Sequence, residues 1–485
     1  MSGYSKLKLP KPIRKTYLFS KFLGYDEEKL TNTLPSNYSA HCYNFACKDC
    51  KLAKGAEIFP LEGVDASTGQ SFLLKQMLTI NGEKKLFVAK NNSANENFNT
   101  LVVSHSGGLD ILPIGKNAEW KRLSANKLYV EAVSFFYKNK YVTLLSDGVN
   151  GVDILDGVTL SHCANSLSIV DMTSHNERVF AVVKGERNSL WFSASFDPFD
   201  WTVSLSGGGY INFDGSLGNV IAVKSLGENL FVFCEYGIYR LSGYVDQTEF
   251  ALKRVYFSCN KIYARSIVES GEFIIFCASD GVYIFDGYSV RKKAVNIDGL
   301  VTANEKTISA SYGDGKYFLS IENELKNGDY GSVNGEENSN CVLLSLAVAD
   351  SCVDICRGVN LECLNQLFLP NKSYVVGLSN EKNCIVAINS QPTTISPRVA
   401  EWKVENIDFD EPNKYKIISA IEFGTECQYE FGIVADGKRR TFTVSPRINQ
   451  IVTNCKGKKF EFFVKCDEQT SNISSPKLIV DFERE

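Results

Sequence analysis

Residues that could bind a metal ion gather near the start of the chain. His41-Cys42 is followed by Cys47-x-x-Cys50, so four soft ligands stand within ten residues. A tetrahedral zinc site takes such imidazole and thiolate ligands. A structural zinc usually joins two separated ligand pairs, however, and here Cys42 directly follows His41. The alternative is a β-turn between two strands with thiols as small side chains, and the sequence leaves open whether His41, Cys42, Cys47 and Cys50 bind zinc.

The remaining histidines and cysteines give no sign of a cofactor. His105, His162 and His175 stand far apart, and each is expected to be a surface residue or a satisfied core residue. A second, looser group without a nearby histidine consists of Cys352, Cys356 and Cys363. The total of 15 Cys without a visible secretory signal favours reduced, buried thiols. We therefore expect no cofactor.

Carboxylates offer two further possibilities for chemistry. A glycosidase needs a pair of them, for which the candidates are Asp197, Asp200 and Glu235. Because Asp197 precedes Pro198 and Asp200 precedes Trp201, turn roles fit these two residues at least as well. A calcium loop could be suspected at Asp147, Asp153 and Asp156, but these lie at hairpin positions without the spaced oxygen ligands of such a loop. Turn chemistry is the expectation for both groups.

Signatures of common active sites are missing from the sequence. It contains no Gly-x-Ser-x-Gly elbow, no Walker loop and no dinucleotide fingerprint. Gly207-Gly208-Gly209 follows a turn and precedes a strand, whereas a phosphate site requires a helix N-terminus there. We predict no catalytic residue and no enzyme.

The elements that carry these residues follow a repeat. Its unit is a strand, a polar turn that is often Asp-Gly, and a second strand ending near Gly; copies begin near residues 85, 140, 178, 229, 272, 316 and 373. Intervals of roughly 40–50 residues with four short strands are typical of β-propeller blades. A blade cannot bury its two apolar faces alone, and radial stacking buries both. The Asp-Gly pairs at 147–148 and 280–281 would supply the positive φ angles of two-residue hairpins.

The pattern changes after about Pro397, where longer alternating strands without the blade-length repeat predict a small β-sandwich. The fold class is thus all-β: a six- or seven-bladed β-propeller followed by a C-terminal β-sandwich. The predicted domains are an N-terminal arm and first strands (1–60), the propeller (61–397) and the sandwich (398–485). The arm carries six cations within 21 residues. It would either dock along a sheet edge or contact nucleic acid.

Composition and charge agree with a globular β-protein. Hydrophobic residues make up 44%, and the 31 Phe and 22 Tyr favour strands. With a net charge of −4, nothing globally basic suggests a nucleic-acid or membrane surface. No stretch approaches the length of a transmembrane helix, and no signal peptide is visible.

One stretch resembles a known family. It runs through Leu190-Trp191-Phe192-Ser193, then Asp197-Pro198-Phe199-Asp200-Trp201, and ends in Phe233-Cys234-Glu235-Tyr236-Gly237-Ile238-Tyr239-Arg240-Leu241-Ser242-Gly243. It is similar to a pattern in propeller proteins of short-tailed phages, the packaged-DNA stabilisation hub and the tubular tail (nozzle) protein B. The strands after Trp402 resemble the sandwich that follows the propeller there. The high cysteine count departs from that family.

The resemblance implies a non-enzymatic structural component of a tailed-phage virion, assembled in the host cytoplasm. The chain would form a ring with itself, as a hexamer, in the tail or the neck and nozzle region. It would contact neighbouring portal or adaptor and tail proteins, using insertions such as Glu322–Ser339. DNA would pass through the conduit during ejection without sequence-specific binding, and no membrane partner is expected.

An alternative of a different class is a glycan-binding or glycan-processing propeller with a carbohydrate-binding sandwich. Its aromatic platforms would be Trp191, Trp201 and Trp402. It would require carboxylates that converge on the propeller axis, and a secretion route that the sequence does not show.

Overall fold

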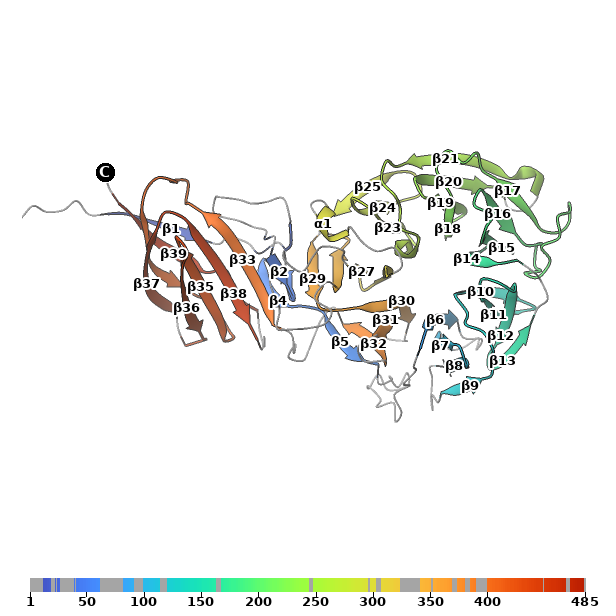
Figure 1. The fold of residues 1–485 in the computed structure, drawn as a ribbon, viewed down its shortest axis with the longest axis horizontal. Helices are drawn as coiled ribbons and strands as arrows, with labels where there is room; N and C mark the ends of the chain where they lie inside the picture. The colour runs from blue at the N-terminus through green and yellow to red at the C-terminus, as the bar shows by residue number, and fades with distance from the viewer. Residues whose placement is uncertain are drawn as a thin grey trace, which may run out of the picture. The chain divides into compact units, whose positions relative to one another are not determined.

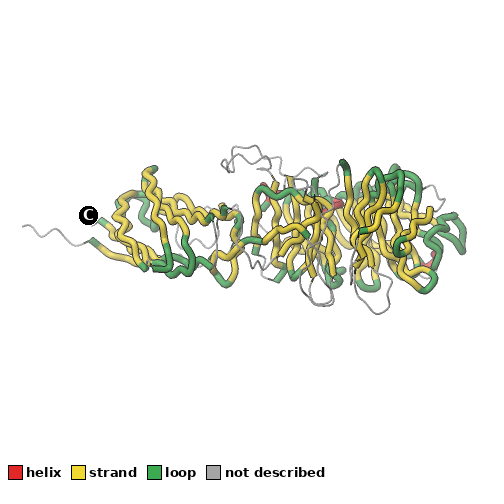
Figure 2. Tube along the Cα trace, turned by 90° about the horizontal axis from the view of Figure 1, so that it is seen from below, coloured by secondary structure: helices red, strands yellow, loops and turns green. Residues whose placement is uncertain are grey.

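The fold is nearly all strand. The structure is a computed structural model that describes residues 12–18, 22, 24–26, 39, 41–61, 82–90, 99–113, 120–162, 167–243, 247–294, 297–301, 307–322, 341–349, 352–368, 373–379, 384–389, 399–447, 449–467 and 472–483. Helical turns in these ranges are limited to η1 (Gln247–Glu249), η2 (Ala264–Ser266) and α1 (Asp298–Val301). Figure 2 shows that strands joined by loops make up almost all of the described chain. Residues 323–340, which hold most of the predicted insertion, lie outside the described ranges.

The chain divides into two compact units. The sandwich unit comprises Met1–Glu57, Cys352–Arg357 and Ser390–Glu485, and the propeller unit comprises Ile58–Ser351 and Gly358–Asn389. The N-terminal residues therefore group with the C-terminal ones, whereas the sequence suggested a separate arm at 1–60. The reason is strand pairing between segments more than 350 residues apart, which no local pattern encodes.

Seven four-stranded antiparallel sheets form the blades of a β-propeller (Figure 1). Blade one consists of β6 (Lys84–Lys90), β7 (Asn99–His105), β8 (Gly108–Pro113) and β9 (Lys121–Leu123). Blade two consists of β10 (Glu131–Tyr137), β11 (Lys140–Ser146), β12 (Val152–Asp156) and β13 (Thr159–His162). Blade three consists of β14 (Ile169–His175), β15 (Arg178–Val183), β16 (Ser189–Phe192) and β17 (Gly209–Asn212). Blades four and five are β18 (Val220–Leu226), β19 (Asn229–Cys234), β20 (Gly237–Ser242), β21 (Ala251–Phe257); and β22 (Val268–Glu269), β23 (Ile274–Ala278), β24 (Gly281–Phe285), β25 (Val290–Ala294). Blades six and seven are β26 (Ser309–Gly313), β27 (Lys316–Glu322), β28 (Cys341–Ala347), β29 (Val353–Arg357); and β30 (Leu361–Phe368), β31 (Ser373–Ser379), β32 (Cys384–Asn389), β5 (Glu57–Pro60). The predicted all-β propeller is confirmed.

The propeller closes on itself. The first strands of neighbouring blades contact one another in turn, from β6 through β10, β14, β18, β22, β26 and β30 and back to β6. The last blade takes its fourth strand, β5, from a segment that precedes the first blade in sequence. Beside it the Leu61 amide donates to the Ile385 carbonyl at 2.9 Å. One apolar cluster, which includes Leu61, Leu86 and Leu378, joins blades one and seven. Closure in this way buries apolar side chains of the first and the last blade against each other.

The repeat seen in the sequence corresponds to the blade period. Its copies near 140, 178, 229, 316 and 373 begin at the second strands of blades two, three, four, six and seven. These strands are mostly apolar because both of their faces are covered; β15 and β23, for example, are buried at every position.

The predicted Asp-Gly turns were wrong in detail. Residues 147–151 form a longer loop, in which the Asp147 carboxylate accepts from the Val149 and Asn150 amides. In blade five the two-residue turn is Ser279-Asp280, and Gly281 is already paired with Ala278. A two-residue Asp-Gly turn does join two strands of the sandwich, where Asp436 and Gly437 have φ angles of 45° and 80°.

The sandwich unit contains two larger sheets and a hairpin. The five-stranded sheet has the order β2 (His41–Tyr43), β33 (Ala400–Ile407), β38 (Phe460–Cys466), β35 (Tyr429–Ala435), β36 (Lys438–Val444). The four-stranded sheet has the order β1 (Ile13–Leu18), β39 (Lys477–Phe482), β34 (Lys416–Glu422), β37 (Gln450–Gly457). The hairpin is β3 (Phe45–Lys48) and β4 (Lys51–Lys54). A single apolar cluster, which includes Trp402, Phe431 and Phe462, forms the core.

The described part of the N-terminal arm, Ile13–Leu18, docks along a sheet edge, which was one of the two expected alternatives; Lys6, Lys8, Lys11 and Lys21 lie outside the described residues. Strand β1 pairs antiparallel with β39 at the edge of the four-stranded sheet. Arg14 on β1 makes two hydrogen bonds to the Asp481 carboxylate, at 2.8 and 2.9 Å. These bonds hold the pKa of Asp481 below its usual value.

Candidate functional site

Charged side chains from neighbouring blades meet on the strands that surround the propeller axis. They are Glu131 at the start of β10, Asp171 on β14, Lys224 on β18 and Glu269 on β22. Each lies on the first strand of its blade, and these first strands contact one another around the ring. Four successive blades thus contribute one ionisable group each.

The best-defined contact in this group is an ion pair. The Lys224 ammonium lies 3.2 Å from the Asp171 carboxylate, and the two side chains are only 22% and 15% exposed. The second Asp171 oxygen accepts from the Val223 amide at 2.8 Å. Asp171 is therefore held in place from the neighbouring blade by one charged and one backbone donor.

Glu131 is in a different electrostatic state. Burial and the nearby Asp171 carboxylate raise the pKa of Glu131 to about 8, although Lys224 opposes this shift. Burial also raises the pKa of Glu269, against the attraction of Lys224 and Lys90. For Lys224, burial lowers the pKa, but the carboxylates of Asp171, Glu131 and Glu269 outweigh burial, so that the net pKa is raised. Glu131 consequently holds its proton more tightly than an ordinary glutamate, next to an ion-paired Asp171.

A protonated carboxyl beside an ion-paired carboxylate can supply a proton on one side and a negative charge on the other. This arrangement suits a metal ion poorly, since Lys224 already neutralises Asp171. In the ranges that the structure describes, no three His, Cys, Asp or Glu side chains gather as a metal site requires.

Sequence reasoning missed this group. Each member is a lone charge in an otherwise apolar strand, which by itself looks like a solvated position. The repeat gives no signal of the group, because the four charges precede the second strands of their blades by nine, seven, five and five residues. Superposing the repeats would therefore not align them.

The carboxylates that the sequence singled out have structural roles, as expected. Asp197 and Asp200 accept from the Phe199 and Thr202 amides, both at 3.0 Å, within the turn that follows β16. Glu235 lies in the turn between β19 and β20 and accepts from the Asn219 amide at 3.0 Å. These carboxylates do not form a pair, and the Gly207-Gly208-Gly209 stretch leads directly into β17. Gly208 and Gly209 are needed for space, since a Cβ at Gly209 would lie 2.6 Å from the Phe192 ring.

Two of the three tryptophans suggested as glycan platforms are buried. Trp201 is 7% exposed and belongs to the apolar cluster between blades two and three, while its indole N–H donates to the Pro198 carbonyl. Trp402 is 2% exposed in the sandwich core. Trp191 is partly exposed, with its ring 5.1 Å from that of Tyr210.

The possible zinc ligands do not converge. The Cys42 and Cys47 thiols contact each other, and this contact together with burial holds the pKa of Cys47 well above its usual value. His41 is paired with Glu401 at 3.2 Å, and Cys50 occupies the β3–β4 turn with a φ of 60°. Of these four residues only Cys42 and Cys47 lie together, so in the described part of the chain they do not form the set of ligands that a zinc site needs.

The other candidates are also separate. His105 and His162 bond to Asp110 and Asp153 in their own blades, and His175 bonds to Ser225. Cys363 lies on β30 in blade seven, whereas Cys356 lies on β29 in blade six and Cys352 directly precedes that strand. The fourteen described cysteines are all free thiols; Cys163 lies outside the described residues.

The aspartates at 147, 153 and 156 bind side chains and amides of the protein. Asp147 caps its loop, as expected. Asp156 pairs with Lys140. Asp153 differs from the expectation, because it is 2% exposed and accepts from Tyr129, Lys127 and His162. It is a buried anchor and not a turn residue.

No family model matches the sequence, and no curated protein matches it. Solved structures similar to the chain include virginiamycin B lyase from Staphylococcus aureus, at 6% identity over 65% of this chain and 98% of that one, with a TM-score of 0.43. The AfRom2 CNH domain matches at 10% identity over 69% of this chain and 99% of that one, with a TM-score of 0.40. The Neurospora crassa Pan2 WD40 domain matches at 10% identity over 64% and 90%, with a TM-score of 0.38. These likenesses concern the propeller fold alone.

Across the described segments, no helix has the length and apolar character needed to span a membrane.

Proposed function

We propose that this chain is a non-enzymatic structural component of a tailed-phage virion. It forms a six-fold ring in the tail or the neck and nozzle region and contributes to the conduit for DNA ejection. The observation that carries the proposal is the coincidence of motif and fold: the stretch that resembles the phage proteins lies in blades three and four of a propeller that a β-sandwich follows.

The contacts within that stretch support a scaffolding role. Arg178 donates to the Ser193 carbonyl at 2.7 Å and lies over the Phe192 ring, while Trp201 fills the contact between two blades. Trp201 of the motif thus helps to fix one blade against the next.

A ring also needs surface that a neighbouring subunit can cover. The loop between β16 and β17 presents apolar side chains to solvent: Phe196 is 63%, Val203 62% and Leu205 85% exposed. Exposed apolar patches of this kind mark protein contacts. We assign them to the heterologous contact between subunits of the ring. Portal or adaptor and tail proteins would be the axial partners.

The test is made on particles from the source organism. Density-purified particles are analysed by quantitative mass spectrometry, and the purified full chain, alone and with neighbouring tail proteins, is imaged by negative-stain microscopy. The expected results are a copy number per particle that is a multiple of six and ring-shaped views. Absence of the chain from such particles would overturn the proposal.

A second candidate is a glycan-processing propeller, because one observation specifically favours it. In this candidate, Glu131, whose pKa is raised, would act as the general acid and the nearby Asp171 as the second carboxylate. Trp201 and Trp402 are buried and cannot stack on a glycan, which is evidence against this second candidate.

The second candidate is tested with aryl glycosides and oligosaccharides. Glycosidase activity that falls at least about 100-fold in Glu131→Gln would establish it and displace the structural role as the chain's main function. If the wild type and Glu131→Gln both hydrolyse these substrates only at the uncatalysed rate, the glycan-processing candidate is excluded.

A further inference from the structure

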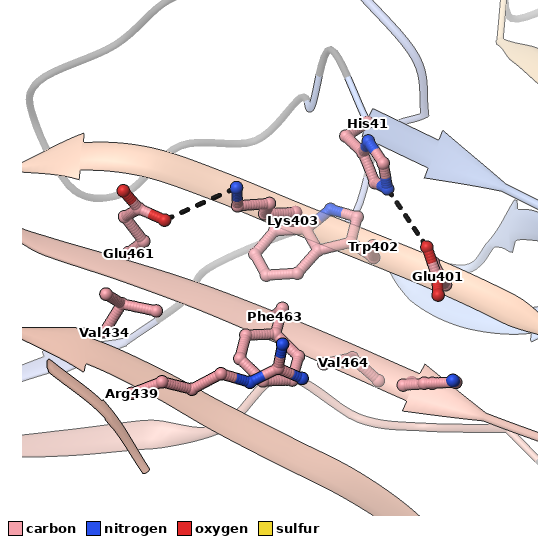
Figure 3. Close-up of a pocket in the computed structure, with 10 residues that line it drawn as sticks. His41, Glu401, Trp402, Lys403, Val434, Arg439, Glu461, Phe463 and Val464 are labelled. Carbon is pink, nitrogen blue, oxygen red and sulfur yellow. Dashed lines mark hydrogen bonds and ion pairs between the residues drawn. The ribbon is translucent and has the colours of Figure 1, made fainter. Parts of the chain in front are cut away.

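A groove crosses the solvent-facing side of the five-stranded sheet in the sandwich unit. Its volume is about 390 Å³, and side chains of β2, β33, β38, β35 and β36 line it. Figure 3 shows His41 and Glu401 at one end, Lys403 and Glu461 toward the other, and Phe463 with Arg439 along one side. The volume lies in the range of small-molecule sites.

The groove exists because of a glycine in a central strand. Gly432 on β35 pairs with Phe463 on β38, and a Cβ at Gly432 would lie 1.8 Å from the Phe463 ring. The ring therefore lies across the glycine instead of standing over its own strand. The Arg439 guanidinium from β36 covers it, 4.2 Å from the ring centre. Glycine in a strand interior often marks close approach of another group.

The charges of the groove are only partly neutralised. Lys403 already forms ion pairs with two carboxylates, those of Glu405 and Glu461, the second at 3.4 Å. His41 is paired with Glu401, and this hydrogen bond lowers the pKa of Glu401.

Two cations of the groove, Arg439 and Lys465, are not closely paired with a carboxylate. Arg439 reaches a carboxylate, that of Glu430, only at 3.5 Å, and its side chain is 61% exposed. Lys465 makes no ion pair with a described residue, although its charge lowers the pKa of Glu401, which lies opposite it on β33. The groove carries three Lys or Arg side chains and two Glu side chains, whereas the whole chain has a net charge of −4. An anionic group can thus be accepted between Arg439 and Lys465.

We propose that this groove binds a carboxylated sugar unit, such as a uronic acid. The sugar carboxylate pairs with Arg439 and Lys465. The sugar hydroxyls donate to the Glu401 and Glu461 carboxylates, which a simple inorganic anion could not use. The Val434 side chain and the edge of Phe463 provide the small apolar surface that a pyranose ring covers.

This inference does not rest on the proposed function. A virion protein and a glycan-processing enzyme could both carry such a site, and the axial carboxylates take no part in it.

The experiment measures binding of galacturonate and glucuronate to the full chain by calorimetry and saturation-transfer NMR. The expected dissociation constant is on the order of 1 mM, as is typical of small, solvated ligands with few anchoring contacts. We expect at least a tenfold weakening in Lys465→Ala and in Arg439→Ala. The control is Lys456→Ala on β37 of the other sheet, which should leave binding unchanged.

Ligand-side controls keep the test independent of how the variants fold. The methyl ester of galacturonic acid removes the charge without altering the protein, and it should bind at least tenfold more weakly. Glucose and inorganic phosphate should bind at least tenfold more weakly as well. The proposal is overturned if uronates fail to bind up to 50-fold above the expected constant, on the order of 50 mM. Phosphate or glucose that bind as tightly as uronates would overturn it equally.

Discussion

Asp110 and Asp153 show how single residues anchor the blades. They occupy corresponding positions in β8 and β12, each is 2% exposed, and each receives several donors, for Asp153 partly from the segment between blades one and two. Arg122 binds Asp110 through two hydrogen bonds, at 2.7 and 2.8 Å. A buried carboxylate is tolerated only where it is paired in this way.

Removing the Asp110 charge should therefore destabilise the first blade. We expect Asp110→Asn to lower the free energy of unfolding by roughly 2–3 kcal/mol, because His105 and Arg122 lose a charged acceptor. Urea denaturation measures the change. Asp156→Asn is the control, because its pair with Lys140 is largely exposed and should contribute less than about 1 kcal/mol. Equal effects of the two substitutions would contradict the role given to Asp110.

Glu131 makes stability depend on pH in a direction opposite to that of most carboxylates. Its pKa in the folded chain is about 8, above the value of about 4.3 for an unfolded glutamate. The folded state binds more protons between these values, so its stability is complete below pH 4.3 and declines as the pH rises toward 8.

The variant Glu131→Gln should lose this decline. We expect the difference in melting temperature, variant minus wild type, to increase steadily from pH 5 to about pH 8 and then to level off, since Gln cannot ionise. Differential scanning calorimetry in buffers of equal ionic strength gives this difference. A difference that stays constant over the range would mean that Glu131 is ionised in the folded chain at neutral pH.

Strand β35 illustrates how an element depends on its neighbour. It runs between β38 and β36, and its Gly432 is the point where the Phe463 ring crosses. Strand and ring are matched in shape: the absent side chain on one strand makes room for an aromatic side chain of the next.

The match can be measured by a double-mutant cycle. We expect Gly432→Ala to destabilise the sandwich by about 1–3 kcal/mol, because the Phe463 ring must move. In a Phe463→Ala background the same change should cost little or be favourable, since Ala suits a strand better than Gly. Chemical denaturation of the four proteins gives the coupling energy. Additive effects would show that the ring does not lie over Gly432.

For the propeller as a whole, closure is the decisive feature. The ring is complete only when β5 joins β32 and Leu61 enters the cluster between blades one and seven. Because every blade depends on both neighbours, an opening at this junction weakens more than one sheet.

Leu61→Ala tests the junction. We expect a loss of about 2–4 kcal/mol from the cavity left in the cluster. Hydrogen exchange should become faster in β6–β8 and in β30–β32, on both sides of the junction. The control Phe368→Ala removes a side chain that is 49% exposed and should change exchange little. Faster exchange confined to β5 alone would show that closure does not stabilise the blades on either side.

The sequence alone determined the all-β class, the blade repeat and the change to a sandwich. It did so because alternation and apolar runs report which strand faces are covered, and the second strands of the blades are covered on both. It also indicated that Asp197, Asp200 and Glu235 have turn roles, since their neighbours in the chain already set those turns.

Only the tertiary structure decided what lies together. The pairing of β1 with β39 and of β5 with β32 joins segments hundreds of residues apart, and backbone hydrogen bonds do not distinguish one strand partner from another by residue type. The convergence of Glu131, Asp171, Lys224 and Glu269 likewise follows from closure of the ring. The groove over Gly432 follows from the order of strands in the sandwich. The residues of each site have no distinctive pattern within their own strand, and their arrangement arises only when neighbouring strands bring them together.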